Sequence, residues 1–138
     1  MVLALSNLHR IPHHLRNPSM SKPLKASIII PSLNRQESLN DCLKSLEEQS
    51  VKPYEIIVET EEGPLAKIRN QAARKSKGEI IVFIDDDVET SPKWLESILE
   101  SFRKGDFIGV TGPSVIGKDY RRNRDLFKWP ILKWLYDK

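Results

Sequence analysis

From residue 26 onward the chain alternates short apolar runs with amphipathic stretches. The apolar runs have the length of strands buried on both faces of a sheet, and they lie at residues 26–30, 54–58, 79–84 and 107–110. The amphipathic stretches between them place apolar side chains three and four positions apart, which is the spacing of a helix face, and they begin at Gln36, Leu65 and Ser91. We therefore predict four strands separated by three helices.

The three predicted helices also carry their own start and stop signals. The first spans residues 36–49 and the second spans residues 65–76, stopping near Gly78. In the third, we expect Ser91 to cap the first turn, Pro92 to lie within that turn, and Gly105 to end the helix.

Strands that alternate with helices of this length indicate an α/β fold. Right-handed crossovers then produce a mostly parallel sheet with helices on both faces. In such sheets ligands bind beyond the carboxyl ends of the strands. This rule directs attention to residues 31–35, 59–63 and 85–88.

We expect three regions along the chain. Residues 1–25 hold three prolines and four basic residues but no acid, and we interpret them as a flexible basic arm, with Met1 or Met20 as the true start. Residues 26–117 form the α/β domain. Residues 118–138 form a basic and aromatic segment with seven Lys or Arg residues.

The composition of the chain is that of a globular protein and argues against several other classes. With 39% hydrophobic and 30% charged residues among 138, the chain has the composition of a globular domain, and it has no apolar run of about 18 residues that would predict a membrane span. Cys42 is its single cysteine, so no intrachain disulfide is expected. We expect a cytoplasmic protein, or one at the cytoplasmic face of the membrane. The basic ends are interpreted as solvated tails, and no nucleic-acid partner is predicted.

The third apolar run leads directly into three adjacent carboxylates, Asp85, Asp86 and Asp87. Carboxylates this close repel one another unless a cation or a set of donors lies beside them. Mg²⁺ or Mn²⁺ takes one or two carboxylates together with phosphate oxygens, and extended backbone would put Asp85 and Asp87 on the same side. The alternative is an acidic turn ahead of a helix, although Pro92 lies five residues beyond Asp87.

The order of four motifs resembles the glycosyltransferases of family 2, which transfer sugars from nucleotide diphosphates. ASIIIPSLNRQESLNDCLKSL resembles the family's opening S-V-I-I-P-T-Y-N-R strand and helix, and EIIV resembles its second strand. LAKIRNQAARKSKGEIIVFIDDDV resembles the A-R-N to D-x-D block, and P-x-W-L-E follows it. The resemblance spans residues 26–112 and implies the Rossmann-like nucleotide-diphospho-sugar transferase fold, of which this chain would be a truncated form.

The resemblance also implies a donor site. Its expected residues are Pro31, Leu33, Asn34, Glu59, Glu61, Arg69, Asn70, Asp85 and Asp86 for the nucleotide sugar, with Asp85 and Asp87 as ligands of Mg²⁺ or Mn²⁺. The helix position of Arg69 would direct its guanidinium to the nucleotide, whereas the alternative is a solvated helix face.

One departure concerns the base. Where the family usually has V-D-D-G-S, this chain has Glu59, Thr60, Glu61, Glu62 and Gly63. Glu61 then occupies an aspartate position and could accept a hydrogen bond from a base N–H. The alternative is that these glutamates are solvated loop charges. The sequence does not determine the identity of the base, the sugar or the acceptor.

A second departure concerns catalysis. Family members carry a further acid beyond the D-x-D that deprotonates the acceptor hydroxyl. Here only Asp119, Asp125 and Asp137 follow in the C-terminal segment, and none lies in a matching motif. General-base help is worth about 10²–10⁴-fold in rate, so we expect a poor transferase, and the catalytic residue is unknown.

The segment 118–138 has two interpretations. It is the start of a missing acceptor half, or residues 120–136 make a peripheral contact with a membrane, where aromatic and basic side chains settle. The acceptor itself could be a glycan, a lipid or a protein.

Three functions therefore follow from the sequence. The first is a metal-dependent glycosyltransferase, truncated or acting with a partner. The second is a non-catalytic module that binds a nucleotide sugar. The third is a haloacid-dehalogenase-like phosphatase, because an apolar strand followed by D-x-D-V-x-T also resembles that family's nucleophile motif, with Asp85 attacking phosphorus and Asp87 as acid and base.

Overall fold

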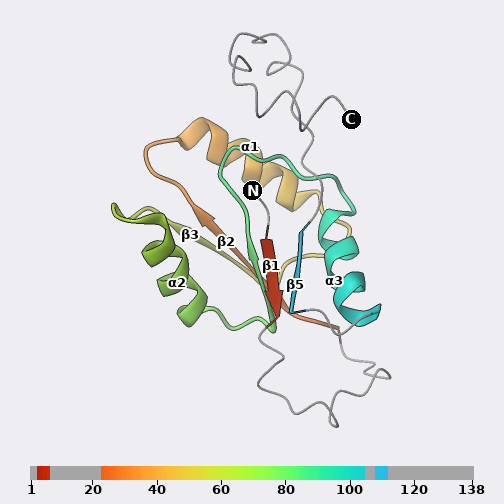
Figure 1. Ribbon diagram of the computed structural model, residues 1–138. Coiled ribbons are helices and arrows are strands. Elements are labelled where there is room, and N and C mark those ends of the chain that lie inside the picture. Colours follow the sequence, from red (N-terminus) through yellow and green to blue (C-terminus); the bar gives the residue numbers. More distant parts are fainter. Residues whose placement is uncertain (1–2, 7–22, 105–107, 112–138) are drawn as a thin grey trace, which may run out of the picture.

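The computed structural model describes residues 3–6, 23–104 and 108–111, and these form an α/β fold around one sheet (Figure 1). The five strands are β1 (Leu3–Ser6), β2 (Ala26–Pro31), β3 (Glu55–Glu59), β4 (Ile80–Phe83) and β5 (Gly109–Val110). The three helices are α1 (Gln36–Glu47), α2 (Leu65–Lys75) and α3 (Trp94–Lys104). Each predicted element between residues 26 and 110 is present, with bounds that differ from the prediction by a few residues.

The sheet has the strand order β3-β2-β4-β1-β5. β2 lies between β3 and β4 and pairs with both in parallel, with Ile28 opposite Ile56 on one side and Val82 on the other. β1 is antiparallel to β4 and to β5, so β5 runs in the same direction as the three parallel strands. The prediction of a mostly parallel sheet is confirmed.

One expectation about the N-terminal region is wrong. Residues 1–25 were expected to form a flexible arm, but Leu3–Ser6 form β1 and fill the gap between β4 and β5. A strand of four residues is stabilised by the neighbours that it pairs with, and local periodicity carries little information about so short a run. Residues 7–22, and the segment 118–138, lie outside the described part of the chain.

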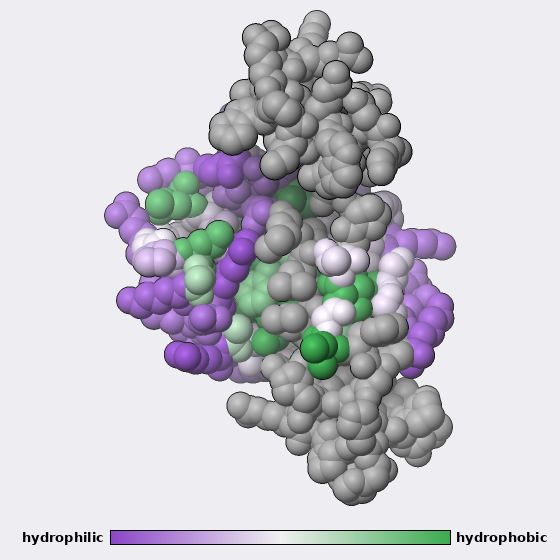
Figure 2. All heavy atoms as spheres, in the orientation of Figure 1, coloured by the Kyte–Doolittle hydropathy of each residue, from purple (hydrophilic) through white to green (hydrophobic). Residues whose placement is uncertain are grey.

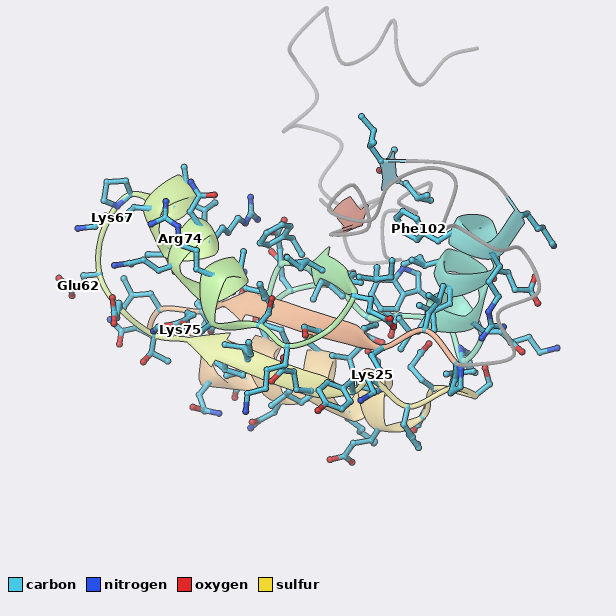
Figure 3. All side chains as sticks on the ribbon, turned by 90° about the horizontal axis from the view of Figure 1, so that it is seen from below. Lys25, Glu62, Lys67, Arg74, Lys75 and Phe102 are labelled. Carbon is cyan, nitrogen blue, oxygen red and sulfur yellow. The ribbon has the colours of Figure 1, made fainter. Side chains whose placement is uncertain are left out.

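β2 and β4 bury both of their faces, as predicted. Alternate residues of β2 point to opposite sides, so Ile28 and Ile30 pack against α1 and α3, whereas Ile29 packs against α2. The two helix layers lie on opposite sides of the sheet (Figure 3). β3, at the edge, is only half-buried. The prediction of helices on both faces is therefore confirmed.

The outer surface of α2 is polar and basic. Lys67 and Arg74 are exposed on this helix (Figure 3), and hydrophilic side chains gather over it at the left of Figure 2. Ile68 and Ala72 form its buried stripe, which is the amphipathic pattern that the sequence predicted.

The start of α3 differs from the prediction. Ser91 was expected to cap this helix, with Pro92 in its first turn, but the helix begins at Trp94. A preceding turn is closed by the Trp94 N–H, which donates to the Ser91 carbonyl at 3.0 Å. The Leu95 N–H instead donates to the side chain of Gln49 at 2.9 Å. A residue from the segment after α1 therefore satisfies the α3 N-terminus, and its distance in sequence hid it from local inspection.

Among the helices of the described residues, none combines the length and the apolar character that a membrane span requires.

Candidate functional site

A cavity of about 390 Å³ lies beyond the carboxyl ends of the three parallel strands. Segments that follow β2, β3 and β4 meet there with the start of α2. The lining residues are Pro31, Ser32, Leu33, Arg35, Glu59, Glu61, Gly63, Leu65, Ile68, Asp85, Asp86 and Asp87. The location agrees with the general rule that open α/β sheets bind ligands at this edge.

The segment after β2 carries the chain along the cavity and into α1. The Ser32 N–H donates to the Glu59 carbonyl at 2.8 Å, which extends the pairing of β2 and β3 by one step. Asn34 has a φ of 55°, in the left-handed region that asparagine tolerates better than most residues. This reversal of the backbone places Arg35 at the N-cap position of α1 and among the cavity residues.

The segment after β4 forms a turn that presents the three aspartates. The Val88 N–H donates to the Asp85 carbonyl at 3.2 Å, and Asp86 and Asp87 occupy the turn between them. The expectation of extended backbone through the three aspartates is therefore wrong. The turn brings Asp86 and Asp87 to the same partner instead.

That partner is Arg35, whose two terminal nitrogens contact two different carboxylates. Arg35 Nη1 lies 2.9 Å from Asp86 Oδ1, and Arg35 Nη2 lies 3.0 Å from Asp87 Oδ2. The Asp86 side chain is only 5% exposed, whereas that of Asp87 is 52% exposed. The hydrogen bond to Asp87 and the charge of Asp86 raise the pKa of Arg35, so the guanidinium stays charged.

The third carboxylate has a different partner on α2. Arg69 Nη2 donates to Asp85 Oδ1 at 2.6 Å, and the guanidinium carbon lies 5.9 Å from the centre of the Phe83 ring. Arg69 Nε is buried and has no hydrogen-bond partner among the described residues. This ion pair fixes α2 to the end of β4.

A buried polar network holds the chain that leaves the aspartate turn. Gln49 Nε2 donates to the Ser91 carbonyl at 2.6 Å and to Thr90 Oγ1 at 3.1 Å, and its Oε1 accepts from the Leu95 N–H. Ser45 Oγ accepts from the Thr90 N–H at 3.0 Å. The network ties residues 90–95 to α1. Sequence analysis missed it, although Gln49 continues the apolar spacing of Leu39, Cys42 and Leu46 toward the core.

The lone cysteine lies behind this site and is unsuited to nucleophilic chemistry. Cys42 is buried, with its Sγ 3.8 Å from the Asp85 carbonyl oxygen. Burial, followed by the charges of Asp86 and Asp87, raises the pKa of Cys42 to about 11. The thiol is therefore protonated at neutral pH, in agreement with the expected place in the core.

The charge of the cavity is strongly uneven. Its lining contains five carboxylates, those of Glu59, Glu61 and the three aspartates, and one guanidinium. Arg69 adds a second guanidinium from behind Asp85, and Lys75 Nζ lies 3.5 Å from Glu59 Oε1 at the outer side. The site thus has an excess of negative charge, although every aspartate has an arginine partner.

The structure gathers most of the residues that the sequence singled out. Seven of them line the cavity: Pro31, Leu33, Glu59, Glu61, Asp85, Asp86 and Asp87. Arg69 reaches the same place through Asp85. Their predicted contacts with a nucleotide stay predictions.

Two of the expected site residues, Asn34 and Asn70, lie outside the cavity lining, and Arg35 has contacts that were not expected. Asn34 and Asn70 are exposed and are not among the lining residues, because Asn34 forms the turn before α1 and Asn70 lies on the solvent side of α2. Arg35 lies in the 31–35 segment that the sequence placed at the ligand edge, but it was not among the expected donor-site residues; in the structure it contacts two of the three aspartates. The available signal was its place directly after the first strand turn, at the predicted ligand edge.

Comparison with known proteins gives a family match. The family model described as glycosyl transferase family 2 matches residues 59–137, which is more than half of the chain. The match begins at the end of β3 and extends beyond the 26–112 range of the sequence resemblance to residue 137.

Two curated relatives carry the same description. An uncharacterized glycosyltransferase, YwdF, of Bacillus subtilis (strain 168) is 28% identical over 109 residues, covering 62% of this chain and 41% of the relative. An uncharacterized glycosyltransferase of Haemophilus influenzae (strain ATCC 51907 / DSM 11121 / KW20 / Rd) is 32% identical over 98 residues, covering 54% of this chain and 33% of the relative. The chain therefore spans less than half the length of either relative. The family match, together with the fold, shows that the chain belongs to glycosyltransferase family 2.

Proposed function

We propose that this chain binds a nucleotide-diphosphate sugar in the cavity together with Mg²⁺ or Mn²⁺, and that it forms the donor-binding part of a glycosyltransferase. The sugar would pass to a glycan, lipid or protein acceptor. Family membership supports the transferase class, and the position of the cavity at the carboxyl edge of the sheet supports a nucleotide ligand there.

The observation that carries the proposal is the aspartate turn, which presents three carboxylates to the cavity at the end of β4. A diphosphate is itself an anion, and five carboxylates against two guanidiniums would repel it. A divalent cation between the turn and the diphosphate removes that repulsion. The charge of the site therefore favours a ligand that arrives with a metal ion.

The side chains at the turn fit such a shared cation. Within the described residues no group of three or more His, Cys, Asp or Glu side chains could hold a metal ion by itself. Mg²⁺ is usually bound by one or two carboxylates, with substrate phosphates and water completing its shell. Asp85 and Asp87 are 35% and 52% exposed and both line the cavity, so they can supply those carboxylates.

When bound, the cation would neutralise the charge that develops on the leaving diphosphate. The protein's own part is to position. Arg69 holds Asp85, Arg35 holds Asp86 and Asp87, and the Gln49 network holds the segment that follows. A direct displacement at the anomeric carbon would invert its configuration.

We place the nucleoside against the apolar part of the cavity. Leu33 and Leu65 are both nearly half-exposed and line the cavity together with Pro31 and Ile68. An aromatic base could bury this apolar surface, and the Glu61 carboxylate could accept a hydrogen bond from a base N–H.

A non-catalytic module that binds the donor is the second candidate function. The phosphatase alternative has no support from the family match. A measured transfer of sugar to any acceptor would exclude the module, whereas donor binding without transfer would favour it.

Titration calorimetry of the full chain tests donor binding. We expect a nucleoside diphosphate or its sugar to bind with Mn²⁺ or Mg²⁺ and to bind at least about tenfold more weakly after chelation of the metal. Asp87→Asn should reproduce the loss in the presence of metal. Glu62→Gln is the matched control, because Glu62 is exposed, lies outside the cavity lining and points outward from the loop before α2 (Figure 3). Equal binding with and without metal would contradict the proposal.

A further inference from the structure

Arg35 occupies the place at the aspartate turn where a cation is expected. Its two terminal nitrogens are each within 3.0 Å of a different carboxylate, so one guanidinium bridges Asp86 and Asp87. The contact with Asp87 joins residues 52 positions apart in sequence, and the two contacts together link the start of α1 to the turn after β4. The guanidinium therefore neutralises part of the charge that a divalent cation would otherwise meet.

The two contacts of Arg35 differ in how easily they can be exchanged. Asp86 is almost fully buried, and a buried carboxylate without a partner is strongly unfavourable. Asp87 and Arg35 are each 52% exposed, and ion pairs this exposed contribute little to stability. The Asp86 contact is thus the persistent one, and the Asp87 contact can be given up.

The other guanidinium of the site lacks this freedom. Arg69 is 18% exposed, lies over the Phe83 ring and contacts Asp85 at 2.6 Å. Its low exposure, the ring contact and the short ion pair hold it in place. Of the two arginines that touch the aspartate turn, Arg35 is the one able to change partners.

We propose that Arg35 is an exchangeable counter-ion of the donor site. In the donor-free protein it neutralises Asp87, and when a divalent cation takes that carboxylate, the released N–H groups of Arg35 bind the diphosphate. The guanidinium fork matches phosphate oxygens as well as carboxylate oxygens, and Arg35 already lines the cavity. This inference rests on the proposed function, because it requires the same metal and diphosphate.

The exchange has a thermodynamic consequence. Without nucleotide, Arg35 competes with the cation for Asp87 and weakens metal binding. With nucleotide, the same side chain gains a new partner, so metal and nucleotide strengthen each other's binding by an equal factor. The protein would therefore take up the metal–nucleotide pair in preference to the free metal ion.

Titration of the full chain with Mn²⁺, followed by electron paramagnetic resonance of the free ion, tests this proposal in the presence and absence of UDP or GDP. Arg35→Gln should bind Mn²⁺ alone about fivefold more tightly than the wild type, and the gain from adding nucleotide should fall by a similar factor. Arg103→Gln is the control for net charge, because Arg103 is exposed in the last turn of α3 and lies outside the cavity lining.

Arg35→Lys separates geometry from charge. An ammonium keeps the charge but cannot span two carboxylates as the planar fork does, so we expect Mn²⁺ affinity between those of the wild type and Arg35→Gln. Thermal unfolding of each variant reports whether it is folded. If Arg35→Gln does not fold, the Mn²⁺ affinity of Arg35→Lys tests the counter-ion role of Arg35.

The outcomes are distinct from those of the proposed function. Unchanged or weaker binding of Mn²⁺ alone in Arg35→Gln would overturn the counter-ion role, and so would wild-type behaviour of Arg35→Lys. If the wild type binds neither UDP nor GDP with Mn²⁺, the nucleotide half of the inference fails with the proposed function, while the titration with Mn²⁺ alone still judges the competition at Asp87.

Discussion

The amino ends and the carboxyl ends of the parallel strands both carry clusters of polar side chains, but the two clusters are built differently. At both ends, carboxylates and donors from segments far apart in sequence meet beside β2. At the amino ends the groups hydrogen-bond to one another around the buried Ser27 side chain, whereas at the carboxyl ends they line a cavity of about 390 Å³.

The closed end is held by neutral donors at short distances. Ser27 Oγ donates to Glu55 Oε1 at 2.6 Å and accepts from the Gly78 N–H at 2.8 Å, and the Lys77 N–H donates to the same Glu55 oxygen at 2.6 Å. Ser27 is fully buried. Each group has its partner within the protein, so this end stabilises the sheet.

The open end is held by charges. Its three aspartates contact two arginines, and the surrounding glutamates leave an excess of negative charge. Two of the three ion pairs contain an aspartate that is at least one-third exposed, and such pairs contribute little to stability. The difference teaches that polar clusters at the two ends are built differently: one is closed on itself and stabilises the sheet, and the other is open and, under the proposed function, binds the ligand.

The largest effect on stability should come from the closed end. Gly78→Ala would place a Cβ 2.6 Å from the Ser27 backbone nitrogen and 2.9 Å from the Lys25 carbonyl oxygen. Overlap with backbone atoms is relieved only by moving the strands, so we expect a loss of about 2–3 kcal/mol in the free energy of unfolding. Urea denaturation measures it.

Gly63→Ala is the comparison at the open end. No atom lies within 4 Å of a Cβ there, but the φ of +148° is unfavourable for alanine, and we expect a smaller loss of about 1 kcal/mol. Equal losses at both glycines would weaken the contrast between the two ends.

The buried hydrogen bonds of Gln49 should also stabilise the carboxyl end of the sheet, because they hold the segment that follows the aspartate turn. Gln49→Leu would leave the Leu95 N–H and the Ser91 carbonyl without their side-chain partner. Unsatisfied buried groups of this kind destabilise by about 1–3 kcal/mol in total. Chemical denaturation measures the loss. Gln36→Leu, at the exposed start of α1, should change stability by less than about 0.5 kcal/mol.

Substitution of Asp87 should affect ligand binding much more than the stability of the fold. Asp87→Asn should weaken metal-dependent nucleotide binding at least about tenfold, equivalent to about 1.4 kcal/mol. The free energy of unfolding should change by less than about 1 kcal/mol, because the ion pair with Arg35 is exposed. Calorimetry and denaturation on the same sample measure both. A large loss of stability would make the open end a structural element like the closed one.

The smallest effect is the pH dependence of the closed end. The hydrogen bond from Ser27, followed by that from the Lys77 N–H, lowers the pKa of Glu55. A lowered pKa in the folded state contributes stability above the ordinary glutamate range, and this contribution is lost as the pH falls through the folded-state pKa. We therefore expect the free energy of unfolding of the wild type to decrease below about pH 4. Glu55→Gln should decrease less steeply over that range in pH-dependent denaturation, and identical slopes would contradict the network.

Much of the site could be predicted because its parts follow strands. The apolar run before Asp85 identifies a buried strand, and the rule for parallel sheets then places the aspartates at the ligand edge together with Pro31 and Glu59. The partners of those aspartates could not be predicted in the same way. Arg35 and Asp87 are 52 residues apart, and neither local spacing nor composition indicates that they touch.

The sequence by itself determined the order of elements from residue 26, the two-sided burial of β2 and β4, and the cluster of acids at a strand end, because periodicity and strand length are local properties. Only the tertiary structure decided that Leu3–Ser6 enter the sheet, that Gln49 caps α3, and that the aspartates turn toward Arg35. These features depend on pairing between distant segments, and their free energy arises only when the sheet and its helices have assembled.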